Sequence, residues 1–403
     1  MNDERSERTD MAGGNSPTPL FLTSVSLSSK TAIGIQTRHV VNFIDAGRHV
    51  HWDREDFVTR HPRSICLERT LAARLGPLKR PGRLRDVVTA LGLRTWRDDI
   101  LPARAARRLE ALRPAVSVIY AVPITHTDTK RMRQVITLLD RPFVLHLWDI
   151  LDDRIEASPD LKWLLTNAAK VVCLTEEMNR VIGQPGEPLV MFTRENAPQL
   201  AQPPVLGKPL RIALIGNVSP YHHGLDDMQA AHAALAAQGH VPEWIHIGPP
   251  ATWKSMRHPA RALMRSAGYV RTAAERDAIL ATCHAGFLPG PSVAPEDDAR
   301  SRYSVPSRML DFAALGLPVI GLVHPRSATA AFLPELVPTM CLGDSQALAD
   351  VLTGLRDPVA WAAASRVSRA VFDRIRGTQP LETLAALLSS FQPDVSPRKP
   401  DVL

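Results

Sequence analysis

The most constraining feature of this chain is a rhythm in which short apolar runs alternate with longer amphipathic stretches. The short runs are rich in Val, Ile, Leu and Phe, a composition typical of strands buried on both faces of a parallel sheet. Such an alternation predicts βα units. We expect strands at 20–25, 49–53, 116–122, 143–149, 170–175 and 189–193, and then at 210–215, 243–247, 285–288, 318–323 and 340–342.

A proline-rich segment divides this pattern in two. Residues 197–209, APQLAQPPVLGKP, hold four prolines and little apolar periodicity, which marks a linker. A chain of 403 residues exceeds one ordinary hydrophobic core. The prediction is an α/β protein with two Rossmann-like, doubly wound domains that face each other across a cleft. Its expected segments are a disordered lead-in at 1–17, an N-terminal domain at 18–196, the linker, a C-terminal domain at 210–375, a helix at 376–391 and a disordered tail at 392–403.

Composition excludes several classes of protein. The four cysteines are far apart and form no CxxC pair, so we expect no disulfide framework and no metal site, and a reducing, cytoplasmic location fits best. Cys173 lies in an apolar run and is expected in the core. No window approaches the ~18–20 apolar residues of a membrane span, and the charged N-terminus lacks the apolar stretch of a signal peptide.

The net charge of +7 is concentrated in a basic block at 60–113, where arginines greatly outnumber acids. A solvated helical face is the commoner explanation. The functional alternative is peripheral contact with an anionic membrane at the inner face of the cell, because each arginine near an acidic surface adds about 1 kcal/mol. Nucleic acid is not an expected partner. Among Phe, Trp and Tyr, only Trp96 falls inside this block, so the stacking platform of a single-strand binder is missing.

The strongest motif is YSVPSRMLDFAALGLPVIG at 303–321. Ser307 is placed to cap a helix that starts at Arg308 and ends at Gly316. Helix starts attract phosphates, and Arg308 would add guanidinium donors there. Asp311 lies one turn later, where a carboxylate accepts hydrogen bonds from ribose hydroxyls. The alternative is a plain amphipathic helix with a cap and a surface acid.

This run resembles the donor-site motif of the GT-B glycosyltransferases, in particular the retaining GT4-type family. There, Pro-Ser-Lys or Pro-Ser-Arg precedes an acidic residue that binds the ribose of a nucleotide, followed by Ala-x-Gly-x-Pro-Val-Ile. The family usually has Glu where this chain has Asp311. The resemblance covers roughly residues 19–391, strongly over this motif and loosely over the N-terminal half.

The segment at 211–235 is similar to the first strand, glycine turn and helix of the family's C-terminal domain. Gly216 would let the backbone approach a phosphate. The family often has cations after this glycine and before the next one, where this chain has Asn217 and His223. Arg300, Arg302 and Arg308 are the candidates to supply the missing charge. The long loop at 290–303 is expected to cover the donor or to be a surface insertion, and its three consecutive acids, at 296–298, are expected to be solvated.

The N-terminal half carries the acceptor side of the resemblance. Gly34 and Gln36 lie in a segment predicted to be a polar loop and helix, which in relatives approaches the transferred sugar and acceptor. Asp149 is at the predicted carboxyl end of a strand, where it would orient or deprotonate an acceptor hydroxyl, or cap a helix. His146 is expected to be a core histidine, and Thr175 a helix cap.

The resemblance implies a retaining, metal-independent, hexosyltransferase-like enzyme that needs no cofactor. Its donor would be a nucleotide diphosphate-sugar and its acceptor a glycan or lipid-linked hydroxyl, in glycan, exopolysaccharide or glycolipid synthesis. The alternatives are a catalytically degenerate binding or scaffold protein, suggested by Asn217 and His223 where cations are expected, and a sugar-nucleotide epimerase on the same fold.

Overall fold

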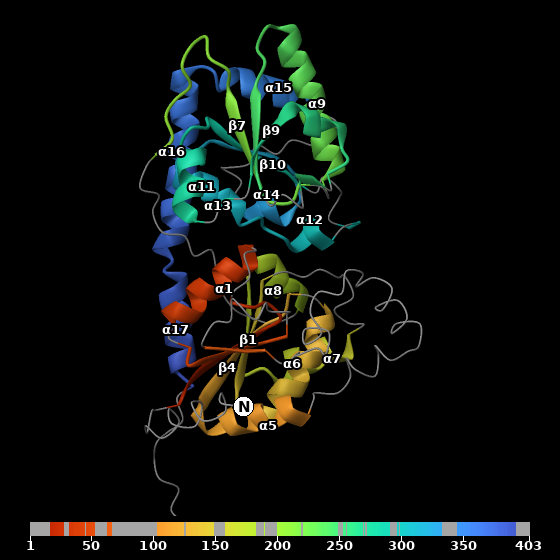
Figure 1. The fold of residues 1–403 in the computed structure, drawn as a ribbon, viewed down its shortest axis with the longest axis vertical. Helices are drawn as coiled ribbons and strands as arrows, with labels where there is room; N and C mark the ends of the chain where they lie inside the picture. The colour runs from red at the N-terminus through yellow and green to blue at the C-terminus, as the bar shows by residue number, and fades with distance from the viewer. Residues whose placement is uncertain are drawn as a thin grey trace, which may run out of the picture. The chain divides into compact units, whose positions relative to one another are not determined.

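A computed structural model of the chain describes residues 17–27, 32–44, 46–52, 63–66, 103–124, 126–148, 158–182, 189, 200–218, 221–248, 253–254, 256–268, 270, 272–290, 296–297, 299–332 and 345–391. Residue contacts divide the chain into two compact units. The first unit consists of Met1–Trp148, Arg154–Leu174 and Leu381–Leu403, and the second of Asp149–Asp153 and Thr175–Pro380. Each unit contains one parallel sheet (Figure 1).

Within its described residues, the first unit has a 6-stranded sheet in the order β3-β2-β1-β4-β5-β6, with every pairing parallel. This is the doubly wound order 3-2-1-4-5-6. Its strands are β1 (Thr18–Thr23), β2 (Arg48–His51), β3 (Ser64–Cys66), β4 (Val116–Val122), β5 (Phe143–Leu147) and β6 (Lys170–Cys173). Its helices are α1 (Ala32–Phe43), α5 (Ala103–Leu112), the short η3 (Arg113–Ala115), α6 (His126–Leu139), α7 (Pro159–Asn167) and α17 (Pro380–Ser389).

The second unit repeats this plan with a 5-stranded parallel sheet in the order β11-β10-β7-β8-β9 in the part that the structure describes. The strands are β7 (Arg211–Ile215), β8 (Glu243–Ile247), β9 (Met264–Gly268), β10 (Ala285–Pro289) and β11 (Val319–Leu322). The helices are α8 (Glu176–Ile182), α9 (His222–Ala237), η5 (Pro259–Leu263), α11 (Ala273–Leu280), α12 (Ala299–Tyr303), α13 (Arg308–Ala314), α14 (Ala328–Phe332), α15 (Ser345–Gly354) and α16 (Pro358–Gly377). Figure 1 shows α9 and α15 on one side of this sheet and α11, α13 and α16 on the other.

The central strands are buried on both faces, as the apolar runs predicted. Every residue of β4, β5 and β10 is buried. The predicted strands at 116–122 and 243–247 coincide with β4 and β8. Local capping sets several helix starts, because a side-chain oxygen of the preceding residue accepts a first-turn amide. Thr175 accepts from the amide of Met178 at 3.2 Å, as expected for a cap.

Two strands were missed by sequence reasoning. β3 is three residues long and lies inside the basic block, so it shows no periodicity. β9, with the sequence MRSAG, is an edge strand with two exposed residues and no β-branched residue. The predicted strands at 340–342 and, apart from Leu189, at 189–193 lie outside the described residues.

The predicted start of the C-terminal helix, at residue 376, is wrong. α16 continues to Gly377, the chain turns at Gln379 with a φ of 47°, and α17 then begins at Pro380. Contacts group α17 with the first unit and α8 with the second. Cys173 is fully buried, which confirms its place in the core. No helix among the described residues is long and apolar enough to cross a membrane.

Candidate functional site

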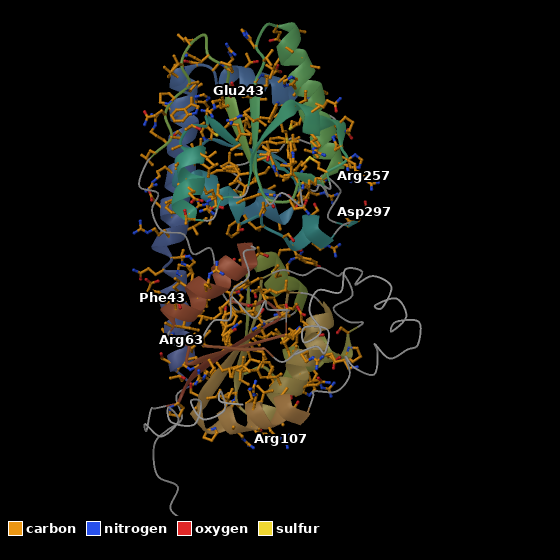
Figure 2. The ribbon with its side chains drawn as sticks, in the orientation of Figure 1. Phe43, Arg63, Arg107, Glu243, Arg257 and Asp297 are labelled. Carbon is orange, nitrogen blue, oxygen red and sulfur yellow. The ribbon has the colours of Figure 1, made fainter. Side chains whose placement is uncertain are left out.

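The strand order of the second unit defines where a ligand is expected. β7 pairs with β8 on one side and with β10 on the other, so the strand order reverses between β7 and β10. In open parallel sheets, ligands bind at such a switch point, beyond the carboxyl ends of the strands. In Figure 2, Glu243, the first residue of β8, labels the end of this unit where the strands begin, and Asp297, in the loop that follows β10, labels the end where they finish. The site is therefore expected at the carboxyl ends of the strands, on the side of Asp297.

Gly216 and Gly224 shape this edge. Gly216 follows β7 with a φ of 83°, a conformation that strains any residue with a Cβ. Gly224, in the first turn of α9, packs against the end of β10 so closely that a Cβ would lie 3.0 Å from the Cα of Pro289. The start of α9 is thereby held between the carboxyl ends of β7 and β10.

The start of α9 has no side-chain cap. Its N-cap residue, Tyr221, makes no side-chain hydrogen bond to the helix, and first-turn amides have no partners within a helix. Such a start attracts anions. The side chains of Asn217, His222 and His223 are exposed around it. Three predicted site residues, Gly216, Asn217 and His223, therefore gather at this edge.

Arg308 brings a positive charge to the same place. Its Nη1 donates to the carbonyl oxygen of Ile215 at 3.0 Å, and its guanidinium lies 5.1 Å from the ring centroid of Tyr221. A Cβ on Gly216 would lie 3.9 Å from this Nη1. A residue 93 positions away in sequence thus lies between the glycine turn and the start of α9.

The prediction that Ser307 caps its helix is wrong. Ser307 makes no cap hydrogen bond and already has helical dihedral angles, with φ −56° and ψ −28°. Because a capping residue has an extended backbone, its side chain cannot reach the first-turn amides from this conformation. The amides of Met309 and Leu310 instead donate to the carbonyl oxygens of Pro306 and Ser307, both at 3.0 Å. Neither α13 nor α9 therefore has a side-chain cap, but two first-turn amides of α13 already donate to backbone carbonyls of the preceding turn.

Asp311 is held by a residue that sequence reasoning missed. The guanidinium of Arg276, in α11, binds both of its carboxylate oxygens, with Nη2–Oδ1 3.1 Å and Nη1–Oδ2 3.3 Å. Both side chains are 19% exposed. Since Arg276 lies 35 residues away on another helix, no spacing in the sequence could have identified this pair.

Two further residues are placed by neighbouring contacts. Arg302, in α12, lies with its guanidinium 5.6 Å from the ring centroid of Tyr303 and donates to its hydroxyl at 3.3 Å. Glu296 is exposed and pairs with Arg326. No cluster of three or more His, Cys, Asp or Glu side chains able to hold a metal ion occurs in the described part of the chain.

In the first unit, Gly34 lies within α1 rather than in the predicted loop, and Gln36 lies in the same helix. Asp149 lies outside the described residues. His146 is fully buried beside Tyr120, with 2.7 Å between its Nδ1 and the phenolic oxygen, which confirms the core histidine. Burial raises the pKa of Tyr120 well above its ordinary value, so this hydroxyl stays a neutral donor.

A buried acid occupies the switch point of the first unit, between β1 and β4. Asp128, in the first turn of α6, is 5% exposed. Its carboxylate accepts from the Ser24 hydroxyl at 3.0 Å, from Trp52 Nε1 at 3.1 Å and from the Ile124 amide at 3.0 Å. It therefore joins the segments that follow β1, β2 and β4. Its one sequence signal was an acid in the helix that follows the predicted strand at 116–122.

Comparison with known proteins gives the fold. No protein-family model matches this sequence, and a search of curated proteins finds no match. The structure is similar to that of Anabaena HepE in complex with UDP and glucose, with 14% identity, a TM-score of 0.59, and coverage of 93% of this chain and 100% of HepE. The chain has a two-domain, Rossmann-like fold of the GT-B type.

Two more structures with the GT-B fold extend the similarity over most of each chain. Sucrose-phosphate synthase of Thermosynechococcus elongatus has 14% identity and a TM-score of 0.58, with coverage of 93% of this chain and 98% of that chain. Trehalose 6-phosphate synthase of Burkholderia multivorans has 12% identity and a TM-score of 0.55, with coverage of 93% and 97%. The predicted α/β fold class is thus confirmed.

Proposed function

We propose that this protein is a retaining, metal-independent glycosyltransferase that moves a sugar from a nucleotide diphosphate-sugar to an acceptor hydroxyl. The observation that carries this proposal is the convergence of the Gly216 turn, the uncapped start of α9 and the Arg308 guanidinium at the switch point of the second sheet. The HepE structures with UDP and with UDP-glucose support the choice of donor.

The diphosphate would bind at the start of α9. First-turn amides and the positive end of the helix dipole stabilise an anion there, and Arg308 adds a fixed charge. This charge compensates for Asn217 and His223, which stand where relatives carry cations. As the sugar leaves, negative charge grows on the diphosphate. Donors that are already in position stabilise that charge without reorganisation, and they would supply the main catalytic effect.

Asp311 would accept hydrogen bonds from the ribose hydroxyls. Its two oxygens are each bound by Arg276, but a carboxylate oxygen has more than one lone pair and can accept a second donor. Arg276 would therefore fix the orientation of the carboxylate before the nucleotide arrives. Ser307 and Arg302 would lie near the same nucleotide, on the segments that lead into α13.

The first unit would bind the acceptor. Gly34 and Gln36 are proposed to face the transferred sugar, and Asp149 is proposed to orient or deprotonate the acceptor hydroxyl. We add Asp128 as a positioning residue, because its carboxylate connects the segments after three strands at the edge where ligands bind. We propose an acceptor that belongs to glycan, exopolysaccharide or glycolipid synthesis.

Titration calorimetry with UDP and UDP-glucose tests the donor site. Wild-type protein should give saturable heat, and Arg308→Gln should weaken binding about 10- to 100-fold, since hydrogen bonds to charged groups contribute about 1.5–3 kcal/mol. Arg308→Lys, which keeps the charge, should lose less. The matched control is Arg211→Gln, at the start of β7 and therefore at the opposite ends of the strands, where its partly exposed ion pair with Glu243 contributes little. Equal binding by Arg308→Gln and wild type would contradict this site.

Product analysis tests the reaction. Incubation of UDP-glucose with candidate glycan and lipid acceptors should release UDP and form a glycoside with the anomeric configuration of the donor. Heat without turnover for any acceptor would favour a binding protein. A product in which an altered sugar remains on the nucleotide would identify an epimerase instead.

The basic block is proposed to hold the protein at an anionic membrane on the cytoplasmic side. Of this block the structure describes α5, on which Arg107 is exposed (Figure 2), together with segments that include Arg63 and Arg113. Arg113 pairs with Asp140. Vesicles that contain anionic lipid should co-sediment the protein, and added salt should release it. Equal binding to neutral vesicles would contradict an electrostatic contact.

A further inference from the structure

Two hydrogen bonds tie the turn after β7 to β8. The amide of Gly216 donates to the carbonyl oxygen of Ile247 at 2.8 Å. In the opposite direction, His246 Nε2 lies 2.8 Å from the carbonyl oxygen of Gly216. A carbonyl oxygen can only accept, so His246 carries its proton on Nε2 and donates it. No local sequence pattern indicates this contact, because it joins residues 30 positions apart.

The imidazole of His246 is held in one orientation. It is fully buried and stacks on Trp253 with 5.3 Å between the ring centroids. On another side it abuts Gly248, where a Cβ would lie 2.7 Å from its Cε1. Burial lowers the pKa of His246, so the ring is neutral at physiological pH. A neutral, immobile donor therefore faces the Gly216 carbonyl.

This hydrogen bond determines where the next amide points. The described residues contain no cis peptide bond, so the carbonyl of Gly216 and the amide of Asn217 point in opposite directions from one planar group. The carbonyl is directed at β8. Because β7 lies between β8 and β10, the amide of Asn217 is directed toward the β10 side, which is the side of the switch point.

We propose that His246 is a positioning residue of the nucleotide site, which aims the Asn217 amide at the diphosphate by fixing the Gly216–Asn217 peptide. This inference rests on the proposed function, since it assigns a role within the same donor site. It also gives position 217 a way to contact a phosphate without a cationic side chain. His246 acts through the backbone and does not touch the substrate.

The test compares His246→Phe, which keeps the stacking on Trp253 but loses the donor, with His246→Gln, which restores an N–H donor at a similar reach. The matched control is Trp244→Phe. It lies on the same face of the same strand and loses a hydrogen-bond donor of its own, the Nε1–H that His232 Nδ1 accepts at 3.2 Å. Each variant is measured for melting temperature, for the Kd of UDP and, with a donor that turns over, for KM and kcat.

His246→Phe should raise the Kd of UDP about tenfold, equivalent to about 1.4 kcal/mol. His246→Gln should recover most of that loss, and Trp244→Phe should melt earlier without changing the Kd. Gly248→Ala, whose Cβ would lie 2.7 Å from His246 Cε1 and 3.1 Å from the Gly216 carbonyl oxygen, should disturb this hydrogen bond from both ends and weaken binding as His246→Phe does. If wild type binds UDP and both His246→Phe and Trp244→Phe bind it equally well, the role of His246 is refuted and the donor site stands. If wild type binds no UDP or UDP-glucose, the proposed function and this inference both fall.

Discussion

The pair of Arg276 and Asp311 allows a quantitative test of the site. We perturb the pair in a double-mutant cycle that compares wild type with Asp311→Ala, Arg276→Ala and the double variant. The two contacts, at 3.1 and 3.3 Å between side chains that are each 19% exposed, form a bidentate and largely desolvated ion pair. At an effective dielectric constant of about 20 and a charge separation of about 4 Å, the attraction is ~4 kcal/mol before desolvation is subtracted. We expect a net coupling of about 1–3 kcal/mol.

Asp311→Ala should be the more harmful single substitution. It leaves the Arg276 guanidinium partly buried without its main partner, which should cost about 2–3 kcal/mol, or roughly 4–12 °C in the melting temperature of a domain of this size. It also removes the proposed ribose acceptor, so the Kd of UDP should rise about tenfold. Arg276→Ala should lower the melting temperature but change the Kd less.

Calorimetric melting and UDP titration of all four proteins give the coupling and the binding loss separately. A coupling below about 0.5 kcal/mol, within the additivity expected of independent sites, would refute the energetic argument. If Asp311→Ala melts early but binds UDP like wild type, the acid is structural and the ribose contact is wrong.

Three further predictions concern the second unit. Gly216→Ala should cost about 1–2 kcal/mol and weaken UDP binding, because its φ is 83°; unchanged titration and melting would contradict this. Gly286→Ala should lower the free energy of unfolding in urea by about 1–3 kcal/mol, because its Cβ would lie 2.2 Å from Phe312 Cγ and push α13 away from β10. The control is the double variant with Phe312→Leu, which should recover part of this loss. Burial lowers the pKa of His246 and His284 below the unfolded value of about 6.5, so the unfolded state binds more protons than the folded state. Stability should therefore fall as the pH drops below about 6.5, by up to ~1.4 kcal/mol per pH unit for the fully buried His246. A melting temperature unchanged between pH 7.5 and 5 would refute this.

Helix starts show where local reasoning succeeds and fails. Thr175 was expected to cap its helix and does so, because capping depends on a few neighbouring residues. Ser307 was expected to do the same, but its backbone is already helical and its hydroxyl has no such role. The preceding Pro306 carbonyl accepts the amide that a cap would have bound. A capping pattern thus predicts a helix start well, and the dihedral angles decide which group satisfies it.

The alternation of apolar and amphipathic segments was sufficient by itself to determine the fold class, because burial on both faces of a parallel sheet imposes a local composition that can be recognised in a single segment. The segments at 211–235 and 303–321, through their resemblance to family motifs, brought Gly216, Asn217 and Arg308 forward as site candidates. The tertiary structure placed Arg308 against Ile215 and Tyr221, Arg276 against Asp311, and His246 against Gly216. These contacts join residues far apart in sequence, and they arise because parallel strands return to the same edge of the sheet through crossovers whose lengths no local pattern records.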